Sequence, residues 1–161
     1  MTIRILLVED EHLQADRIEE EILAALGRKG VVCEIVKADT ESRALAILTQ
    51  PGDRPDFNLY LVDVMLPWAR GEEIEEPGDP RVRQEGPLYA GFRVIEAIRK
   101  TERAQPDQWA PIILYTSATL TLEHNGHQRR LNYHRLQKTD DLDAELVNLS
   151  VKLLAAAGHT I

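Results

Sequence analysis

The sequence predicts an α/β fold in which a parallel sheet carries helices on both of its faces. Strand-like apolar runs and helix-like segments alternate five times along the 161 residues. The clearest runs are almost continuously apolar, which is typical of strands buried on both faces. With right-handed crossovers, this alternation favours a doubly wound sheet. The length and the 43% hydrophobic content suit one domain, so we expect residues 1–161 to form a single domain.

The first half of the chain holds three strand-like runs and two helices. Apolar runs at 2–8 and 31–36 favour β-strands, and a third run, from Asn58, ends in Asp63-Val64-Met65-Leu66-Pro67. Between the first two, apolar residues at helical spacing predict a helix over 11–26, closed by Gly27 and Gly30. A second helix is expected from Thr40, which is a suitable N-cap.

The second half repeats the pattern after an irregular stretch. Residues 68–90 are rich in proline, glycine and acids and show no apolar period, so we expect an inserted loop that is either a functional lid or docking element, or disordered. The remaining elements follow it in the order helix 91–103, strand 111–115, a weak helix 120–131, strand 133–136 and helix 143–157.

Composition excludes several classes of function. The formal net charge is −8 and no basic run is present, which disfavours direct binding of nucleic acid. No apolar stretch is long enough for a membrane span, and no signal pattern opens the chain, so a cytoplasmic, membrane-free protein is expected. The lone Cys33 is interpreted as a small core residue. The oligomeric state is left open.

Polar side chains follow four of the five predicted strands. Because parallel strands end at one edge of a sheet, these side chains are expected to meet there. Taken alone, Asp63 could equally cap a turn, but the coincidence of four strand ends is harder to dismiss. The residues are Glu9 and Asp10 after the first strand, Asp63 after the third, Thr116 after the fourth and Lys138 after the fifth.

This set suits phosphoryl transfer to an aspartate. Three converging carboxylates repel one another, and Mg²⁺ is the cation that such oxygen ligands favour. A hydroxyl and an ammonium would hold the remaining phosphoryl oxygens while an aspartate attacks phosphorus. The inventory predicts aspartyl phosphorylation at Asp63.

The chain resembles the receiver domains of two-component response regulators. The resemblance lies in four segments that cover most of the chain apart from the insertion: the acid pair in Leu7-Val8-Glu9-Asp10-Glu11, the acceptor segment 61–67, the segment 111–117 and Lys138. It implies a flavodoxin-like five-stranded sheet in the order 2-1-3-4-5. The chain would be an atypical receiver, because residues 68–90 make its connection after the acceptor strand unusually long.

The resemblance also implies a role for each matching residue. Asp63 resembles the phosphoacceptor, Thr116 the hydroxyl that reorients towards the phosphoryl group, and Lys138 its paired cation. The Mg²⁺ ligands would be Asp10 directly, Glu9 through water, Asp63, and the main-chain carbonyl of Met65. The implied donor is a phosphohistidine on a sensor histidine kinase or a histidine phosphotransfer protein, and a downstream effector protein would read the conformational change.

Three departures from the family pattern lie close to these residues. Ser117 stands where alanine is usual, Thr139 where proline is usual, and Arg135 where the family carries an aromatic residue that rotates on activation. Strand alternation places Tyr133 on the same face as Arg135, one repeat further from the site. The usual relay from the threonine to an aromatic residue is therefore not expected.

Two other functions are weighed against the phosphoacceptor. A degenerate receiver would keep the fold and bind proteins without phosphorylation. An aspartyl-phosphate phosphatase of the haloacid dehalogenase type would need a second aspartate where this chain has Met65, and ranks far behind. The leading prediction is a stand-alone signalling module rather than an enzyme. Other motifs are interpreted as structural: His124 and His127 lack a third metal ligand, and the leucine stripe of the last helix is core.

Overall fold

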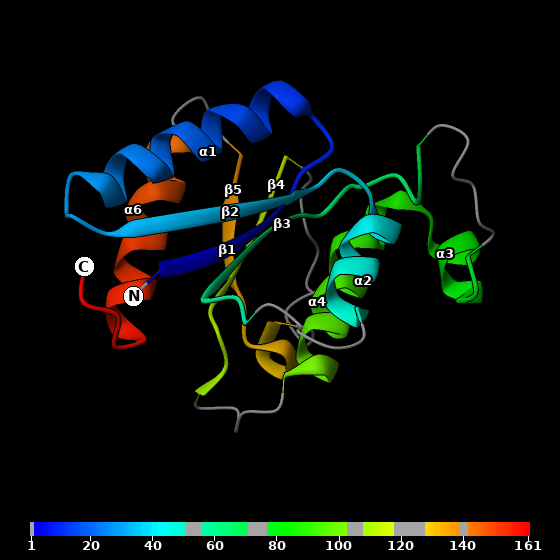
Figure 1. The fold of residues 1–161 in the computed structure, drawn as a ribbon. Helices are drawn as coiled ribbons and strands as arrows, with labels where there is room; N and C mark the ends of the chain where they lie inside the picture. Colours follow the sequence, from blue (N-terminus) through cyan, green and yellow to red (C-terminus); the bar gives the residue numbers. More distant parts are fainter. Residues whose placement is uncertain (1, 51–55, 71–76, 103–107, 118–127, 139–141) are drawn as a thin grey trace.

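The fold is built on five parallel strands. A computed structural model describes residues 2–50, 56–70, 77–102, 108–117, 128–138 and 142–161. The strands are hydrogen-bonded in the order β2-β1-β3-β4-β5, which confirms the predicted fold class (Figure 1). Their bounds are β1 (Thr2–Val8), β2 (Val32–Ala38), β3 (Leu59–Asp63), β4 (Ile112–Thr116) and β5 (His134–Gln137).

Helices cover both faces of this sheet. Helices α1 (His12–Gly27) and α6 (Leu142–Ala156) lie on one face, and α2 (Glu41–Thr49) and α4 (Ala90–Thr101) lie on the other (Figure 1). Each face has its own apolar core, one packed around Ile18 of α1 and the other around Ile95 of α4. None of these described helices is long and apolar enough to cross a bilayer.

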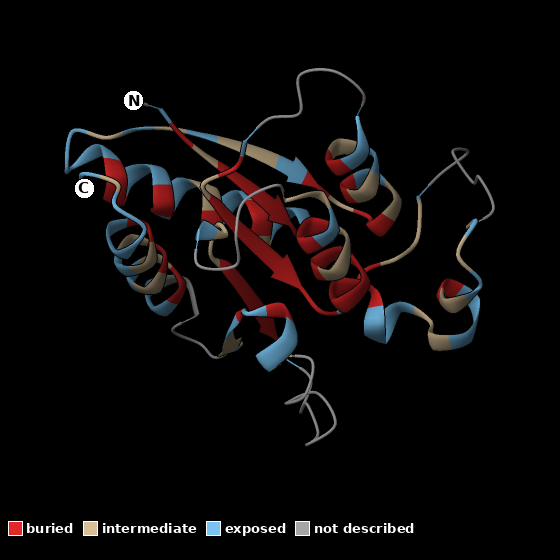
Figure 2. Ribbon diagram, turned by 90° about the horizontal axis from the view of Figure 1, so that it is seen from below, coloured by how far each residue is buried: buried red, intermediate tan, exposed pale blue. Residues whose placement is uncertain are grey.

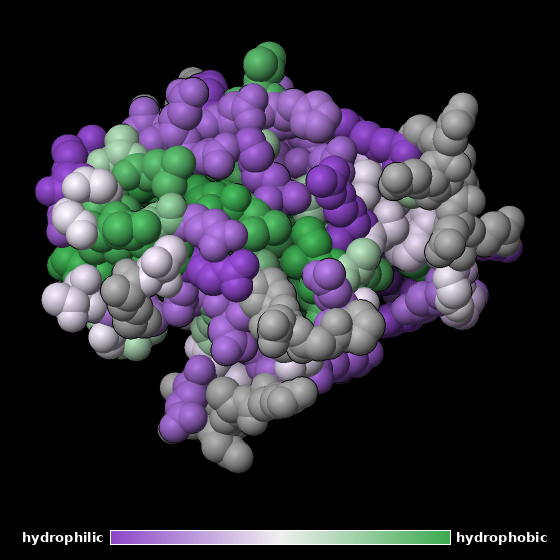
Figure 3. Space-filling view, viewed as in Figure 1, coloured by the Kyte–Doolittle hydropathy of each residue, from purple (hydrophilic) through white to green (hydrophobic). Residues whose placement is uncertain are grey.

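Burial follows the apolar runs of the sequence. Every residue of β3 and β4 is buried, as expected for central strands covered on both faces (Figure 2). The edge strand β2 differs, because its Val32 is exposed. Apolar side chains gather along this edge, between α1 and α6, and polar surface borders them (Figure 3).

The predicted helix ends are largely confirmed. The Arg43 amide donates to Thr40 Oγ1 at 3.2 Å, so Thr40 is the N-cap of α2. Helix α1 ends at Gly27, and Gly30 adopts a φ of 74° in the turn that leads to β2. Strand β5 begins one residue later than predicted. Most of the predicted helix 120–131 lies outside the described residues. The part that is described, 128–131, is helical.

The described residues 77–90 of the inserted segment contain regular structure that the sequence does not indicate. We expected irregular structure throughout 68–90, but residues 80–85 form a helix, α3 (Pro80–Glu85), followed by the 3-10 turn η1 (Pro87–Tyr89). Asp79 caps α3 by accepting from the Arg81 amide at 2.9 Å, and proline opens the helix. A helix of six residues has fewer than two turns and is too short to show an apolar period, which explains why the sequence pattern did not predict it.

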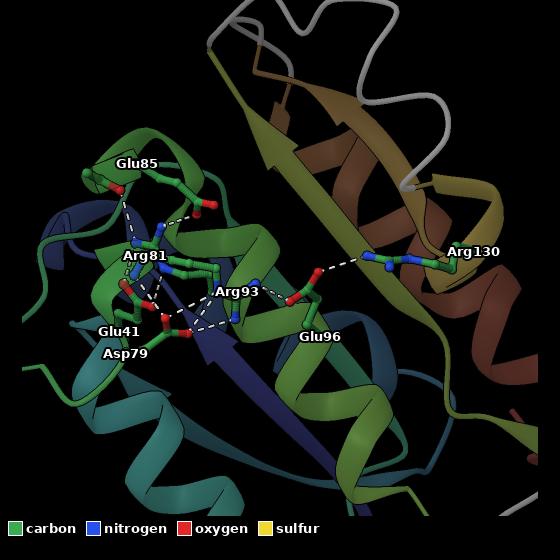
Figure 4. Close-up of polar contacts among 8 residues, drawn as sticks. Glu41, Asp79, Arg81, Glu85, Arg93, Glu96 and Arg130 are labelled. Atoms are coloured by element: carbon green, nitrogen blue, oxygen red, sulfur yellow. Dashed lines mark hydrogen bonds and ion pairs between the residues drawn. The ribbon is translucent and has the colours of Figure 1, made fainter. Parts of the chain in front are cut away.

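Ion pairs attach the inserted segment to the helices beside it. Arg93 of α4 is buried and bonds both oxygens of Glu41 in α2, at 2.7 and 2.8 Å (Figure 4). The same guanidinium bonds Glu85 at 2.8 Å and the Gly86 carbonyl at 3.0 Å. Arg81 adds a contact to Glu96 of α4 at 2.9 Å. Residues 77–89 are therefore docked on α2 and α4.

Candidate functional site

The strand register brings the predicted polar residues to one edge of the sheet. Val8 pairs with Val62, Asp63 with Tyr115, and Thr116 with Gln137, so the ends of β1, β3, β4 and β5 are level to within about one residue. Glu9, Asp63, Thr116 and Lys138 consequently lie together although the sequence separates them widely.

Lys138 joins two of the carboxylates. Its Nζ donates to Asp63 Oδ2 at 2.8 Å and to Glu9 Oε2 at 3.1 Å. The same ammonium donates to Gln14 Oε1 at 3.2 Å, and it lies over the ring of Tyr115, 5.1 Å from the centroid. The Tyr115 hydroxyl donates in turn to the Val8 carbonyl at 3.4 Å. Lys138 is thus held on several sides.

The three acids form a compact group of oxygen ligands. Glu9, Asp10 and Asp63 can each offer a carboxylate oxygen, and these atoms lie within 4.8 Å of one another. Hard divalent cations such as Mg²⁺ and Mn²⁺ prefer carboxylate oxygens, so the donor set fits such an ion. Met65 lies at the rim of this group, where its amide donates to Asp63 Oδ1 at 3.4 Å.

Burial makes the negative charges of this group costly. Desolvation raises the pKa of Glu9, the Asp63 carboxylate raises it further, and Lys138 partly offsets both effects. Desolvation also raises the pKa of Asp63, against the lowering effects of Lys138 and the Met65 amide. Burial alone would lower the pKa of Lys138, but its bonds to Asp63 and Glu9 raise it overall. Lys138 is therefore charged at neutral pH, and the site attracts further positive charge.

Thr116 and Gly91 shape the backbone around Asp63. Thr116 is fully buried at the end of β4, and its carbonyl accepts from the Lys138 amide at 2.8 Å. Gly91, the second residue of α4, lies directly against the acceptor segment, where its amide donates to the Val64 carbonyl at 2.9 Å. A Cβ at this glycine would lie 2.3 Å from the Asp63 carbonyl oxygen and 2.8 Å from Val64 Cα. Only glycine permits this approach of helix to strand.

Three residues at the site were not predicted from the sequence. Gln14 and Tyr115 contact Lys138, and Arg70 donates to Asp10. Gln14 could have been found, because it lies in the first turn of the helix that follows the acid pair. Tyr115 immediately precedes Thr116 on a buried strand, but alternation alone does not indicate an ammonium above its ring. Arg70 carries no local signal, since it lies in the inserted segment.

The departures from the receiver pattern take definite positions where the structure describes them. Tyr133 is buried and packs on Phe92, with ring centroids 6.2 Å apart, whereas Arg135 is only half-buried. Leu136 packs on the α1 side of the sheet. Because successive side chains of a strand alternate between the two faces, Arg135 and Tyr133 lie on the α4 side. Thr139, His124 and His127 lie outside the described residues.

Several solved structures that match this fold are response regulators or receiver domains. The phosphorylated cyanobacterial phytochrome response regulator RcpA matches with a TM-score of 0.63 and 20% identity, over 97% of this chain and 96% of its own. The Mn²⁺-bound form of response regulator Rcp1 matches with a TM-score of 0.59 and 21% identity, over 94% of each chain. A signal receiver domain from Clostridium thermocellum matches with a TM-score of 0.63 and 14% identity, over 94% of this chain and 96% of its own.

These comparisons establish the class of fold. The sheet order and the helices on both faces match the fold of these response regulators and receiver domains over nearly the whole chain. No protein-family model and no curated protein sequence matches the chain, so the relationship is seen in the fold rather than in the sequence.

Proposed function

We propose that this chain is a phosphoacceptor signalling module, a receiver domain that takes a phosphoryl group onto Asp63. The observation that carries the proposal is the bridge from Lys138 Nζ to Asp63 and Glu9, with Asp10 in the same carboxylate group. Residues from three strand ends have no structural need to meet in a partly buried cluster of three acids and one lysine. Such an arrangement is typical of sites that bind or transfer charged groups.

Asp63 would act as the nucleophile. One of its carboxylate oxygens forms a bond to phosphorus while the bond from phosphorus to the donor nitrogen breaks, and the departing imidazole keeps the electron pair. Lys138 already contacts Asp63 Oδ2 and would pair with the phosphoryl oxygens that arrive there. Thr116, buried on the neighbouring strand, would supply a hydroxyl to the same group and connect it with the surface.

The acid group would hold the divalent cation that this chemistry uses. Asp10 and Asp63 are the direct carboxylate ligands in this proposal, with Glu9 acting through water and the Met65 carbonyl as a further ligand. A bound Mg²⁺ would offset the repulsion among the carboxylates and the negative charge of the phosphoryl group. The structural neighbour Rcp1 was solved with Mn²⁺, which supports a divalent ion in this kind of fold.

The partners follow from this chemistry. The phosphoryl donor would be a phosphohistidine on a sensor histidine kinase or a histidine phosphotransfer protein, and the output would go to an effector protein in the cytoplasm. Residues 1–161 would act as one receiver module, with 68–90 as its insertion. The proposal assigns a signalling role without turnover of a separate substrate.

The proposal is tested by modification of Asp63. Incubation with Mg²⁺ and acetyl phosphate, or with beryllofluoride, is expected to give an adduct that native mass spectrometry detects in the wild type. Asp63→Asn should abolish the adduct, whereas Asp16→Asn, which alters an exposed carboxylate of α1, should retain it. Absence of an adduct in the wild type, or the same adduct in Asp63→Asn, would overturn the proposal.

A second candidate is a receiver that signals without phosphorylation. The observation in its favour concerns the residues that would replace the usual aromatic switch. Arg135 is charged and stands at the position where receivers carry an aromatic residue, and the nearby Tyr133 is packed on Phe92. The same experiment separates the two functions. A chain that binds partner protein equally well as wild type and as Asp63→Asn, and forms no adduct, would be a phosphorylation-independent binding module.

A further inference from the structure

One carboxylate of the acid group is already paired with a cation from the inserted segment. Arg70 Nη2 donates to Asp10 Oδ2 at 3.0 Å and to the Asp10 carbonyl oxygen at 2.8 Å. The neighbouring Nη1 lies 3.4 Å from His12 Nε2. One guanidinium therefore binds the side chain and the backbone of the same residue and reaches the start of α1.

Two basic residues share the three acids of the site. Lys138 pairs with Glu9 and Asp63, and Arg70 pairs with Asp10. The formal charge of this group is then −1, from three carboxylates and two cations, rather than the −2 that Lys138 alone would leave. Each added positive charge weakens the attraction for a divalent ion, so Arg70 acts electrostatically against metal binding.

Hydrogen bonds hold the start of the insertion at the rim of the site. The Glu41 amide donates to the Pro67 carbonyl at 3.0 Å, and the Ser42 amide donates to the Trp68 carbonyl at 2.9 Å. These bonds fix the backbone two residues before Arg70, beside the first turn of α2. Arg70 also lines an open groove of about 970 Å³ along α2, which leaves space for its side chain to swing away from Asp10.

We infer that Arg70 competes with the divalent cation for the Asp10 carboxylate. Its guanidinium pairs with the carboxylate that the cation would use, and cation binding would displace it into the groove beside α2. The inserted segment would in this way set the cation affinity of the site and would sense whether a cation is bound. The inference rests on the cation site of the proposed function and adds a residue that opposes it.

The test is the affinity of matched variants for Mg²⁺ and Mn²⁺, measured by isothermal titration calorimetry. Arg70→Gln removes the competing charge, and we expect it to lower the dissociation constant roughly three- to fivefold, which is the upper part of the range by which partly exposed ion pairs change equilibria. Arg4→Gln is the matched control. The ion pair of Arg4 with Glu34 and that of Arg70 with Asp10 are both 3.0 Å long, and the arginine side chains are 34% and 41% exposed. Loss of Arg4 removes the same net charge far from the site and should leave the affinity within about twofold, because screening weakens distant exposed charges.

A fluorescence titration tests the displacement itself. Trp68 lies two residues before Arg70, and Trp109→Phe leaves it as the only tryptophan. Mg²⁺ should change its emission in this background, and the change should shrink when Arg70→Gln is added. Asp10→Asn should abolish the response in both proteins.

The outcomes separate this inference from the proposed function. Tighter binding of cation by Arg70→Gln than by both the wild type and Arg4→Gln supports the competition. Equal or weaker binding by Arg70→Gln overturns it and leaves the phosphoacceptor proposal standing. If neither the wild type nor Arg70→Gln binds either cation, the cation site itself is refuted, and the competition with it.

Discussion

Replacing Arg93 by methionine removes the guanidinium that joins α2, α4 and the inserted segment. Arg93 is 5% exposed and its partner Glu41 is 1% exposed, so the pair is shielded from water. Methionine keeps an unbranched apolar side chain in the space but leaves the Glu41 carboxylate buried without its cation. It also removes the donors to Glu85 and to the Gly86 carbonyl.

The expected loss of stability is about 3–5 kcal/mol, because removing one partner of a buried ion pair strands the other charge in a poorly polar environment. Two comparisons isolate this cause. Arg81→Met breaks the exposed pair with Asp79 and one of the two ion pairs of Glu96. Its cost should stay below about 1 kcal/mol, because solvent screens the 40% exposed guanidinium and Arg130 still pairs with Glu96. The double variant Glu41→Leu with Arg93→Met removes both buried charges and should regain most of the loss.

Urea unfolding followed by circular dichroism at neutral pH would measure these differences. Free energies for the wild type, Arg93→Met, Glu41→Leu and the double variant give the coupling between Glu41 and Arg93. The reasoning is refuted if Arg93→Met costs no more than Arg81→Met, or if the double variant is less stable than Arg93→Met alone. Either result would mean that water reaches Glu41 once the arginine is gone.

Two further predictions concern single positions in the sheet and its helices. Gly91→Ala should destabilise the protein by about 3 kcal/mol, because its Cβ would meet backbone atoms of Asp63 and Val64 that cannot move aside. Gly27→Ala is the control: a Cβ there meets nothing within 4 Å, so this variant should be neutral or stabilising. Chemical denaturation measures both changes in stability, and equal effects would contradict the close approach at Gly91. Burial raises the pKa of the Cys33 thiol from 9.0 to about 11, so the folded state disfavours the thiolate. At pH 8 a disulfide reagent should therefore react with the folded protein roughly a hundredfold more slowly than with the unfolded chain. The free energy of unfolding should fall as the pH rises from 9 towards 11. Equal rates for folded and unfolded protein would contradict this shift.

The sequence was sufficient for the sheet because the strands and the first, second, fourth and last helices have strong local signals. The continuous apolar run before Asp63 and the period of α1 each identify an element without tertiary information. The meeting of Lys138 with Asp63 was also predictable, since parallel strands end at one edge whatever packs around them. The roles of these residues in phosphoryl transfer remain predictions.

The missed contacts depend on loop conformation or on burial of residues that are usually exposed. Glu41 lies in the first turn of a helix, where an acid normally faces water and the helix dipole, yet here it is buried against Arg93. Nothing local distinguishes Arg93 from other arginines on α4. Likewise, the position of Arg70 at Asp10 follows from how the chain leaves β3, and no pattern in the sequence encodes that path.

Among the described strands, β2 pairs only with β1. Its outer side presents backbone donors and acceptors next to apolar side chains, which is the arrangement that recruits strands from other molecules. Here Glu34 is tied to Arg4 of β1, and Lys37 is tied to Asp16 and Glu19 of α1. A strand added from outside would have to accommodate these charges beside its own backbone. Neutralising both positions, as in Glu34→Thr with Lys37→Thr, would remove these charges from the edge of the sheet, and we expect it to favour self-association through β2.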